Sequence, residues 1–452
     1  MVDPADVHDT LRRHLLVDGF ELVLDTAASS GSTIVDARDG TAYLDLFTSF
    51  ASAPLGMNPP QLLGDPAFLA ELTQVAVNKP ANSDLYSTHQ AEFVATFARV
   101  LGDLALPYLF FVEGGGLAVE NALKTAFDWK SRHNEAHGRD PALGTRVLHL
   151  SGAFHGRTGY TMSLTNTDPV KIARFPKFDW PRIPAPVVRF PVHPHLGELE
   201  AAEAHALDAA RAAFRATPHD IACFVAEPIQ GEGGDRHLRA EFLTALQAVC
   251  EEHDALFVMD EVQSGCGLTG TAWAYSQLGV HPDVMAFGKK TQVCGIMAGG
   301  RLDEVADHVF KVPSRLNSTW AGNLTDMVRS RRMLEVIEAE GLIPAAATKG
   351  ELLMAELAML AAHHPEVDNV RGRGLMCAFD MPDLRTRDAL VTRLRREQHV
   401  LILPSGEHSV RFRPSLAVTT GELRQGVAAI DAVLSSPSGR PLKVRRIQEP
   451  AP

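Results

Sequence analysis

An aspartate and a lysine that end two neighbouring strand-like segments constrain this chain most strongly. Asp260 ends the apolar run ALFVMD, and Lys289 follows the apolar run VMAFG 29 residues later (289 minus 260). Pyridoxal phosphate chemistry needs a lysine amine that binds the cofactor aldehyde as an imine, and a carboxylate that keeps the pyridine nitrogen protonated. Each feature alone is common, because buried strands often end in aspartate and most lysines are solvated. The pair therefore indicates a cofactor site only together with the segments around it.

Composition excludes several classes of function. The chain has 452 residues and a formal net charge of -12, and its basic residues are scattered. This charge argues against a surface for nucleic acid or anionic membranes and favours an enzyme that acts on small molecules. The five cysteines form no CxxC pair, so neither a zinc site nor a disulfide framework is expected, and no metal site is predicted.

The sequence also predicts where the protein works. No apolar stretch approaches the roughly 20 residues that a membrane-spanning helix needs, and the start, MVDPADVHDTLRR, is too polar for a signal peptide. We therefore expect a cytoplasmic protein without a membrane anchor. The final segment, SSPSGRPLKVRRIQEPAP, has neither helical nor strand periodicity and is predicted to be a loosely held tail.

Strand-length and helix-length segments alternate through the middle of the chain. The strand-like runs are YLFFVE, ACFVAEP, ALFVMDE and VMAFGK, and the helical patterns are LAVENALKTAFDWKSRH and AEFLTALQAVCEEHD. This alternation is typical of an α/β protein with a mostly parallel sheet covered by helices. Ligands of such sheets bind at the carboxyl ends of the strands.

The pattern changes towards both ends of the chain, which predicts a second, smaller α+β domain. Two helical stretches and three short strand-like pieces follow residue 326, and strand-like pieces such as TIVDARDG and AYLDLF lie near the start. We therefore expect an N-terminal segment, residues 1–62, that packs with the small domain, a large cofactor-binding domain, residues 63–330, and a C-terminal small domain, residues 331–452.

Three glycines separate the first middle strand from the helix after it, in FVEGGGLAVEN. Glycine lets the backbone approach a ligand closely, and the free amides at the start of a helix attract anions. Gly115 and Gly116 are therefore candidates to hold a phosphate. A tight strand-to-helix turn would explain the same residues without any ligand.

A set of motifs resembles one enzyme family along nearly the whole chain. FVEGGG, AFHGRTGY, EPIQGEGG, MDEVQSG, AFGKK, NSTWAGN, VRGRGLM and VRFRPSL occur in the order seen in the class III aminotransferases, which have PLP fold type I. Within this class, LAVENALKTAFDWK, LTNT, IQGEGGDRH and VPSRLNSTW most closely resemble the lysine 6-aminotransferases. The resemblance implies pyridoxal 5'-phosphate as cofactor and a large domain with a mostly parallel sheet beside a smaller α+β domain.

The resemblance also assigns cofactor contacts. It implies that Lys289 binds the cofactor covalently, that Asp260 faces the pyridine nitrogen and that Gln263 faces the ring hydroxyl. Phe154, in AFHGR, resembles the aromatic residue that stacks on the ring, although an aromatic at such a position is often simply core. Thr319, in NSTW, resembles a residue that the second subunit contributes to the phosphate. The implied assembly is a homodimer with active sites at the subunit interface, although NSTW alone is also compatible with an ordinary polar turn.

The resemblance implies that two substrates, an amino donor and a keto-acid acceptor, bind in turn in one pocket. The acceptor 2-oxoglutarate has two carboxylates, whereas L-lysine that reacts at its terminal amine presents none near the cofactor. The resemblance implies that Arg411 binds the acceptor 1-carboxylate and that Glu232 pairs with Arg411 when the donor is bound, so that no bare cation remains buried. Arg157 would bind the distal carboxylate of either substrate, and Asn317 is assigned to the substrate site. Without the motifs, each arginine would fit a surface ion pair equally well.

The predicted reaction is the transfer of the 6-amino group of L-lysine to 2-oxoglutarate, which gives 2-aminoadipate 6-semialdehyde and L-glutamate. Ornithine, 4-aminobutyrate or another ω-amine is the alternative donor, and a PLP-dependent mutase or racemase is a more distant alternative. The sequence departs from the family pattern at Gly114 and Gly116, which offer backbone donors only, and relatives commonly carry alanine at position 116. This departure predicts a looser phosphate loop.

Overall fold

The computed structural model describes residues 2–436, so most of the predicted tail lies outside the described residues. Its largest element is a seven-stranded sheet in the order β3-β11-β10-β9-β6-β4-β5. These strands are Tyr108–Val112 (β3), Arg146–Leu150 (β4), Arg182–Ile183 (β5), Ile221–Ala226 (β6), Leu256–Asp260 (β9), Val284–Phe287 (β10) and Cys294–Ala298 (β11). Only β11 runs antiparallel to its neighbours, so the sheet is mostly parallel, as predicted.

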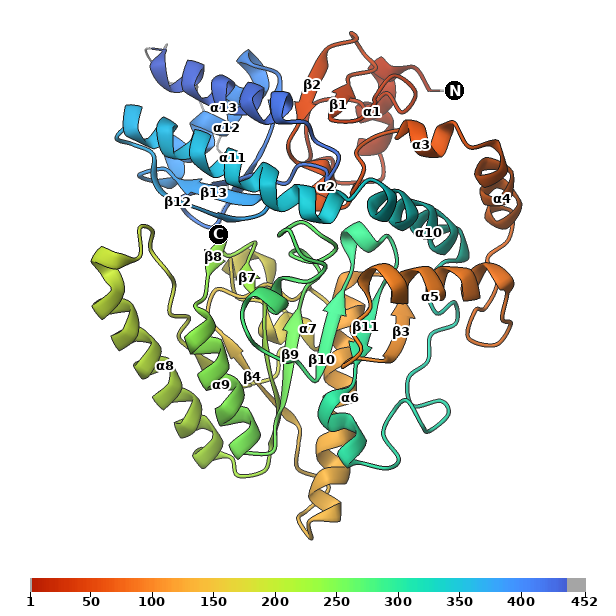
Figure 1. The fold of residues 1–452 in the computed structure, drawn as a ribbon, viewed down its shortest axis with the longest axis vertical. Helices are drawn as coiled ribbons and strands as arrows, with labels where there is room; N and C mark the ends of the chain where they lie inside the picture. The colour runs from red at the N-terminus through yellow and green to blue at the C-terminus, as the bar shows by residue number, and fades with distance from the viewer. Residues whose placement is uncertain (1, 437–452) are drawn as a thin grey trace.

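Helices cover both faces of this sheet (Figure 1). Successive residues of β9 alternate between two core clusters. Phe257 and Met259 pack in the cluster that includes residues of α9 (Ala240–Glu252), and Leu256 and Val258 pack in the cluster that includes residues of α6 (Gly115–Ala136). Such strands read as continuous apolar runs because both of their faces are buried. In α9 (Ala240–Glu252), the buried side chains recur at helical spacing, as the sequence predicts; they are Phe242, Leu243, Leu246, Val249 and Cys250.

A second part of the molecule, drawn above the large sheet in Figure 1, combines the two ends of the chain. Strands β1 (Thr33–Val35) and β2 (Ala42–Asp45) form a sheet with β14 (Val400–Leu401), in which β2 and β14 pair in parallel. A four-stranded sheet consists of Asp368–Arg373 (β12), Met376–Asp380 (β13), Leu403–Ser405 (β15) and Ser409–Arg411 (β16). The N-terminal segment is thus tied to the C-terminal region by backbone hydrogen bonds.

The remaining elements surround these sheets. A short hairpin joins Ile229–Gln230 (β7) to Arg236–His237 (β8). The other helices are Val7–Arg12 (α1), Thr48–Ala51 (α2), Pro60–Leu63 (α3), Pro66–Ala76 (α4), Thr88–Leu101 (α5), Gly115–Ala136 (α6), Thr161–Leu164 (α7), Leu196–Ala216 (α8), Leu324–Ala339 (α10), Leu342–His363 (α11), Leu384–Glu397 (α12) and Thr420–Ser435 (α13). Within residues 2–436, no helix has the length and apolar content that crossing a membrane requires.

Candidate active site

A cavity of about 490 Å³ lies where the central strands end. Asp260 is the last residue of β9, and Lys289 follows β10 by two positions. The two strands are parallel neighbours, with Asp260 opposite Ala286. The lining residues are Ser52, Gly115, Gly116, Phe154, His155, Gly156, Glu227, Asp260, Val262, Gln263, Lys289, Gln292 and Cys294. The structure therefore brings six of the predicted cofactor residues, including Lys289 and Asp260, to one cavity.

Lys289 is held in a tight turn just after β10. Its backbone has φ 55°, in the left-handed region, and its carbonyl accepts hydrogen bonds from the Gln292 backbone amide at 2.8 Å and from Gln292 Nε2 at 3.3 Å. Burial, together with the positive charges of Arg411 and Arg413, lowers the pKa of Lys289 to about 8, while Asp260 opposes this shift. A lysine with this pKa is substantially neutral near pH 8, which makes it a better nucleophile and base.

Asp260 lies in a group of buried acidic and imidazole side chains that includes His155 and Glu227. His155 Nδ1 lies 2.7 Å from Asp260 Oδ2, and Glu227 accepts the Phe154 backbone amide at 2.9 Å. Burial alone would lower the pKa of His155, but the hydrogen bond to Asp260 raises it above its usual value. Burial raises the pKa of Glu227 to about 7. The contact with His155 thus fixes the position of the Asp260 carboxylate at the cavity wall.

The glycine loop meets the cavity at the start of α6. Gly114 has φ 111°, which favours glycine, and Gly115 begins the helix. A Cβ on Gly115 would lie 2.8 Å from Val262 Cγ1, so this position requires glycine. A Cβ on Gly116 would meet Thr158 Cγ2 at an ordinary 3.4 Å. Gly115 and Gly116, the first two residues of α6, thus line the cavity.

Gln263 is oriented by arginines. Its Oε1 accepts hydrogen bonds from Arg413 Nη2 at 2.7 Å and from Arg411 Nη1 at 3.3 Å. Arg413 is itself fully buried and pairs with Asp235, whose Oδ2 accepts from Arg413 Nη1 at 2.8 Å. Because the arginines occupy the amide oxygen, the amide nitrogen of Gln263 is left as the donor towards the cavity.

Glu232 joins two cations beside the cavity. Arg411 Nη2 donates to Glu232 Oε2 at 2.9 Å, and Lys171 Nζ donates to Glu232 Oε1 at 2.6 Å. Burial alone would raise the pKa of Glu232, but Arg411 and Lys171 lower it. The expected Arg411–Glu232 pair is thus present as an ion pair, and Lys171 is a partner that the sequence did not predict.

Arg157, Asn317 and Thr319, three further predicted residues, are not among the residues that line the cavity. Arg157 is exposed, with its guanidinium carbon 5.9 Å from the centre of the Phe154 ring. Asn317 and Thr319 are also exposed, in the segment between β11 and α10. A single chain does not bring these three side chains together with Lys289, and their roles stay predictions.

The N-terminal segment reaches the cavity through an unusual turn. Residues Thr48–Ala51 all have positive φ, from 42° to 66°, which is rare for residues other than glycine. The turn is fixed by Asp45, which accepts the backbone amides of Phe47 and Thr48 at 2.9 and 2.7 Å. Ser52 then lines the cavity, and its carbonyl accepts from Gln292 Nε2 at 2.6 Å. The preceding residues of the turn, Ser49 and Phe50, do not line the cavity.

Lys290, the neighbour of Lys289, is held by the protein backbone and does not line the cavity. Its amine is buried and donates to the Gln263 carbonyl at 2.9 Å. Burial lowers the pKa of Lys290 to about 7. Of the two adjacent lysines, only Lys289 lines the cavity.

These residues fit the predicted cofactor. One cavity offers an amine of lowered pKa, a buried carboxylate, the first turn of a 22-residue helix and the flat face of Phe154. They match, respectively, the aldehyde, the pyridine nitrogen, the phosphate and the ring of pyridoxal phosphate. His155 and Glu227 complete the set. Neither residue was predicted, although His155 follows Phe154 directly in AFHGR and Glu227 ends the strand-like run ACFVAE.

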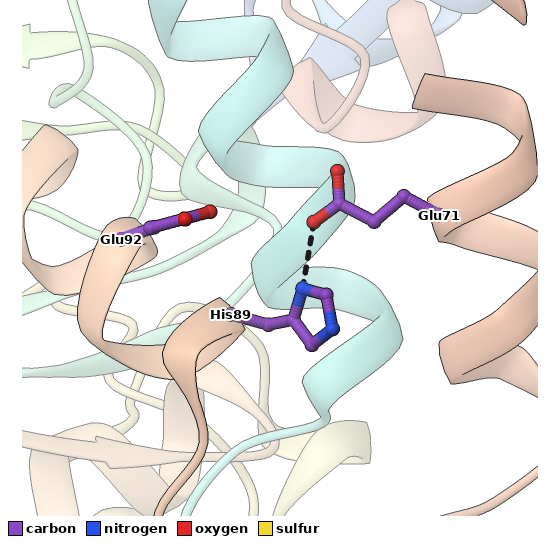
Figure 2. A group of neighbouring side chains, drawn as sticks. All are labelled: Glu71, His89 and Glu92. Atoms are coloured by element: carbon purple, nitrogen blue, oxygen red, sulfur yellow. Dashed lines mark hydrogen bonds and ion pairs between the residues drawn. The ribbon is translucent and has the colours of Figure 1, made fainter. Parts of the chain in front are cut away.

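A separate cluster has the composition of a metal site. The potential ligand atoms of Glu71, His89 and Glu92 lie within 4.8 Å of one another (Figure 2). His89 Nδ1 is 2.8 Å from Glu71 Oε1, and Arg331 forms ion pairs with both glutamates. Because Arg331 already forms ion pairs with both carboxylates, the cluster is explained as an ion-pair network that ties α4 and α5 to α10.

Comparisons with known proteins agree with this geometry. The family model described as Aminotransferase class-III matches residues 18–434. The L-lysine-epsilon aminotransferase of Mycobacterium tuberculosis is 64% identical over 434 residues, which are 95% of this chain and 96% of that protein. The enzyme of the same name from Streptomyces clavuligerus is 58% identical, over 94% of this chain and 93% of that protein. A solved structure of lysine aminotransferase from M. tuberculosis superposes with a TM-score of 0.94 and 64% identity, and covers 96% of this chain and 99% of that chain.

Proposed function

This chain belongs to the class III aminotransferase family, and we propose that it transfers the 6-amino group of L-lysine to 2-oxoglutarate. The products are 2-aminoadipate 6-semialdehyde and L-glutamate. The choice of lysine follows the relatives at 58% and 64% identity, which are lysine-epsilon aminotransferases. The structural observation that carries the proposal is the Arg411–Glu232 ion pair beside the Lys289 cavity, because it suits alternation between a reacting end without a carboxylate and one that carries a carboxylate.

Pyridoxal phosphate is the cofactor, and when bound it supplies an aldehyde and an electron-withdrawing ring. Lys289 Nζ would hold it, and the first-turn amides of Gly115 and Gly116 would bind its phosphate. Asp260, backed by His155, would keep the ring nitrogen protonated. Once its amine is free, Lys289 acts as a base, which takes a proton from carbon 6 of lysine and returns one during the acceptor half-reaction.

Two arginines beside the cofactor cavity, Arg411 and Arg157, would bind the substrate carboxylates. We propose that Glu232 neutralises Arg411 while lysine reacts, and that Arg411 binds the 1-carboxylate of 2-oxoglutarate in the second half-reaction. Arg411 is 3% exposed as a side chain, so leaving it without an anion would be costly. Arg157, beside Phe154, is proposed for the distal carboxylate, with Asn317 as a further substrate contact.

We also propose that the working unit is a cytoplasmic homodimer. Thr319 and Asn317 are exposed in one chain, as expected for residues that complete the active site of a partner subunit. All five cysteines are free thiols, which agrees with a reducing compartment.

The proposal is tested by incubating the purified holoenzyme with lysine, ornithine or 4-aminobutyrate, each with and without 2-oxoglutarate, and measuring glutamate. We expect glutamate from lysine, dependent on 2-oxoglutarate, and no turnover by Lys289→Ala. Glutamate formation from ornithine or 4-aminobutyrate at a rate equal to or above that from lysine would contradict the proposed donor.

A further inference from the structure

We propose that Lys171 is a positioning residue for the Arg411–Glu232 pair, which we call the carboxylate gate. The gate is closed when Arg411 pairs with Glu232 and open when Arg411 turns to the acceptor. Lys171 keeps Glu232 paired in the open gate, and so selectively favours binding of 2-oxoglutarate. This inference rests on the proposed function, because it assumes that Arg411 serves the acceptor carboxylate. It adds a second cation to the pair formed by Glu232 and Arg411.

The two oxygens of Glu232 are divided between two cations. Oε1 accepts from Lys171 at 2.6 Å, and Oε2 accepts from Arg411 at 2.9 Å. The three side chains are only 29%, 18% and 3% exposed for Glu232, Lys171 and Arg411. Because each cation holds a different oxygen, one contact can be broken without disturbing the other.

Lys171 is itself fixed independently of Arg411. It ends the short 3-10 turn Pro169–Lys171, which Asp168 caps through the Val170 backbone amide at 2.9 Å. Its amine lies 3.4 Å from Thr167 Oγ1 and 5.6 Å from the centre of the Phe154 ring. The Lys171 ammonium therefore stays near Glu232 when the Arg411 contact is lost.

Arg411 is likewise prepared to change partners. Its Nη1 donates to the Gly231 carbonyl at 2.9 Å, and this bond anchors the guanidinium when the contact to Glu232 is broken. Its Nε is buried and has no hydrogen-bond partner within the described part of the chain. An incoming carboxylate would satisfy this donor and replace the bond to Glu232.

The energetic consequence concerns only one of the two gate states. With the gate closed, Glu232 has Arg411 as a partner whether or not Lys171 is present. With the gate open, Glu232 keeps an ion pair only through Lys171, and would otherwise be a part-buried carboxylate without a counter-charge. Removal of Lys171 should therefore make opening harder and leave the closed state, which lysine uses, nearly as stable.

The test measures the two half-reactions separately by rapid mixing, using the holoenzyme with lysine and the aminated enzyme with 2-oxoglutarate. For Lys171→Met we expect the apparent dissociation constant of 2-oxoglutarate to rise about tenfold, and to rise at least about fivefold more than that of lysine. Lys171→Arg should restore most of the acceptor affinity. Lys177→Met, which removes an exposed lysine six positions along the same loop, is the matched control and should leave both constants within about twofold.

A double-variant comparison separates positioning from direct binding. In a Glu232→Gln background the gate has no carboxylate to hold, so adding Lys171→Met should change the 2-oxoglutarate constant by less than about twofold. A loss as large as in the unmodified background would show that Lys171 binds the acceptor itself and would overturn the inference. Equal losses in both half-reactions would indicate a general structural role and would also overturn it.

Failure of the proposed function is distinguishable from failure of this inference. The acceptor half-reaction can be driven in both directions by the glutamate and 2-oxoglutarate couple, without lysine. If the unmodified enzyme rejects lysine, the proposed donor is wrong, and the Lys171→Met effect on 2-oxoglutarate still decides whether Lys171 supports the gate.

Discussion

Asp260 shows how a single side chain sets the chemistry of the cavity. Its carboxylate is buried and lies 2.7 Å from His155 Nδ1, and this contact fixes it where the pyridine nitrogen is expected. Asp260→Asn keeps the shape and removes the charge. We expect kcat to fall about a thousandfold while the protein remains folded. Steady-state kinetics with a thermal-unfolding control measure this, and a loss below tenfold would show that Asp260 only ends its strand.

The lowered pKa of Lys289 predicts how the rate of covalent cofactor uptake depends on pH. Its pKa is lowered to about 8, chiefly by burial, so below pH 8 the amine is mostly protonated and cannot attack an aldehyde. Cofactor-free enzyme should therefore take up pyridoxal phosphate covalently at a rate that rises through about pH 8 and then levels off. Borohydride trapping followed by mass spectrometry at each pH measures this rate, with Lys289→Ala as the control. A midpoint near pH 10 would show that the site does not lower the lysine pKa.

Residue patterns could reveal only part of this site. Asp260 and Lys289 could be placed together because parallel neighbouring strands end at the same sheet edge, and the structure confirms the pairing of their strands. The Lys171–Glu232 contact joins two loops 61 residues apart and follows no period of a helix or strand, so sequence spacing gave no signal for it. The same reason applies to the buried pair Arg413–Asp235.

Among the elements, the glycine loop at the start of α6 contains two glycines, Gly115 and Gly116, that look alike in sequence but have different neighbours in the structure. A Cβ at Gly116 meets only ordinary contacts, whereas one at Gly115 would lie 2.8 Å from Val262 Cγ1. Gly116→Ala should stabilise the fold by about 0.5 to 1 kcal/mol, because alanine favours the helix. Gly115→Ala should destabilise it and weaken cofactor binding. Thermal unfolding and cofactor titration of both variants check this, and equal behaviour would contradict the described loop.

Long strands and periodic helices could be predicted from the sequence, whereas short strands could not. The long apolar runs of β3, β6, β9 and β10 and the periodic helices α6 and α9 are confirmed, because burial on both faces or on one face leaves a clear pattern. Short strands such as β5, with two residues, and the antiparallel β11 were not predicted. Their position depends on neighbouring strands rather than on a period of their own.

At the scale of the whole molecule, the proposed dimer predicts complementation between inactive chains. Lys289→Ala removes the amine of its own site, and Thr319→Ala should weaken the phosphate site of the partner. In a hybrid dimer, one active site then keeps both residues. Co-expressed differently tagged chains should therefore recover about a quarter of the unmodified activity after random pairing, when cofactor is limiting. Absence of recovery in isolated hybrid dimers would place Thr319 outside the partner's site.

The proposed reaction requires that the 6-amino nitrogen of lysine, and not the 2-amino nitrogen, is transferred to 2-oxoglutarate. The most direct measurement gives the holoenzyme 2-oxoglutarate with lysine that carries ¹⁵N at either the 6-amino or the 2-amino position, and then determines the label in glutamate by mass spectrometry. We predict labelled glutamate from the 6-labelled substrate alone. Labelled glutamate from the 2-labelled substrate, or unlabelled glutamate from both, would contradict the proposed reaction.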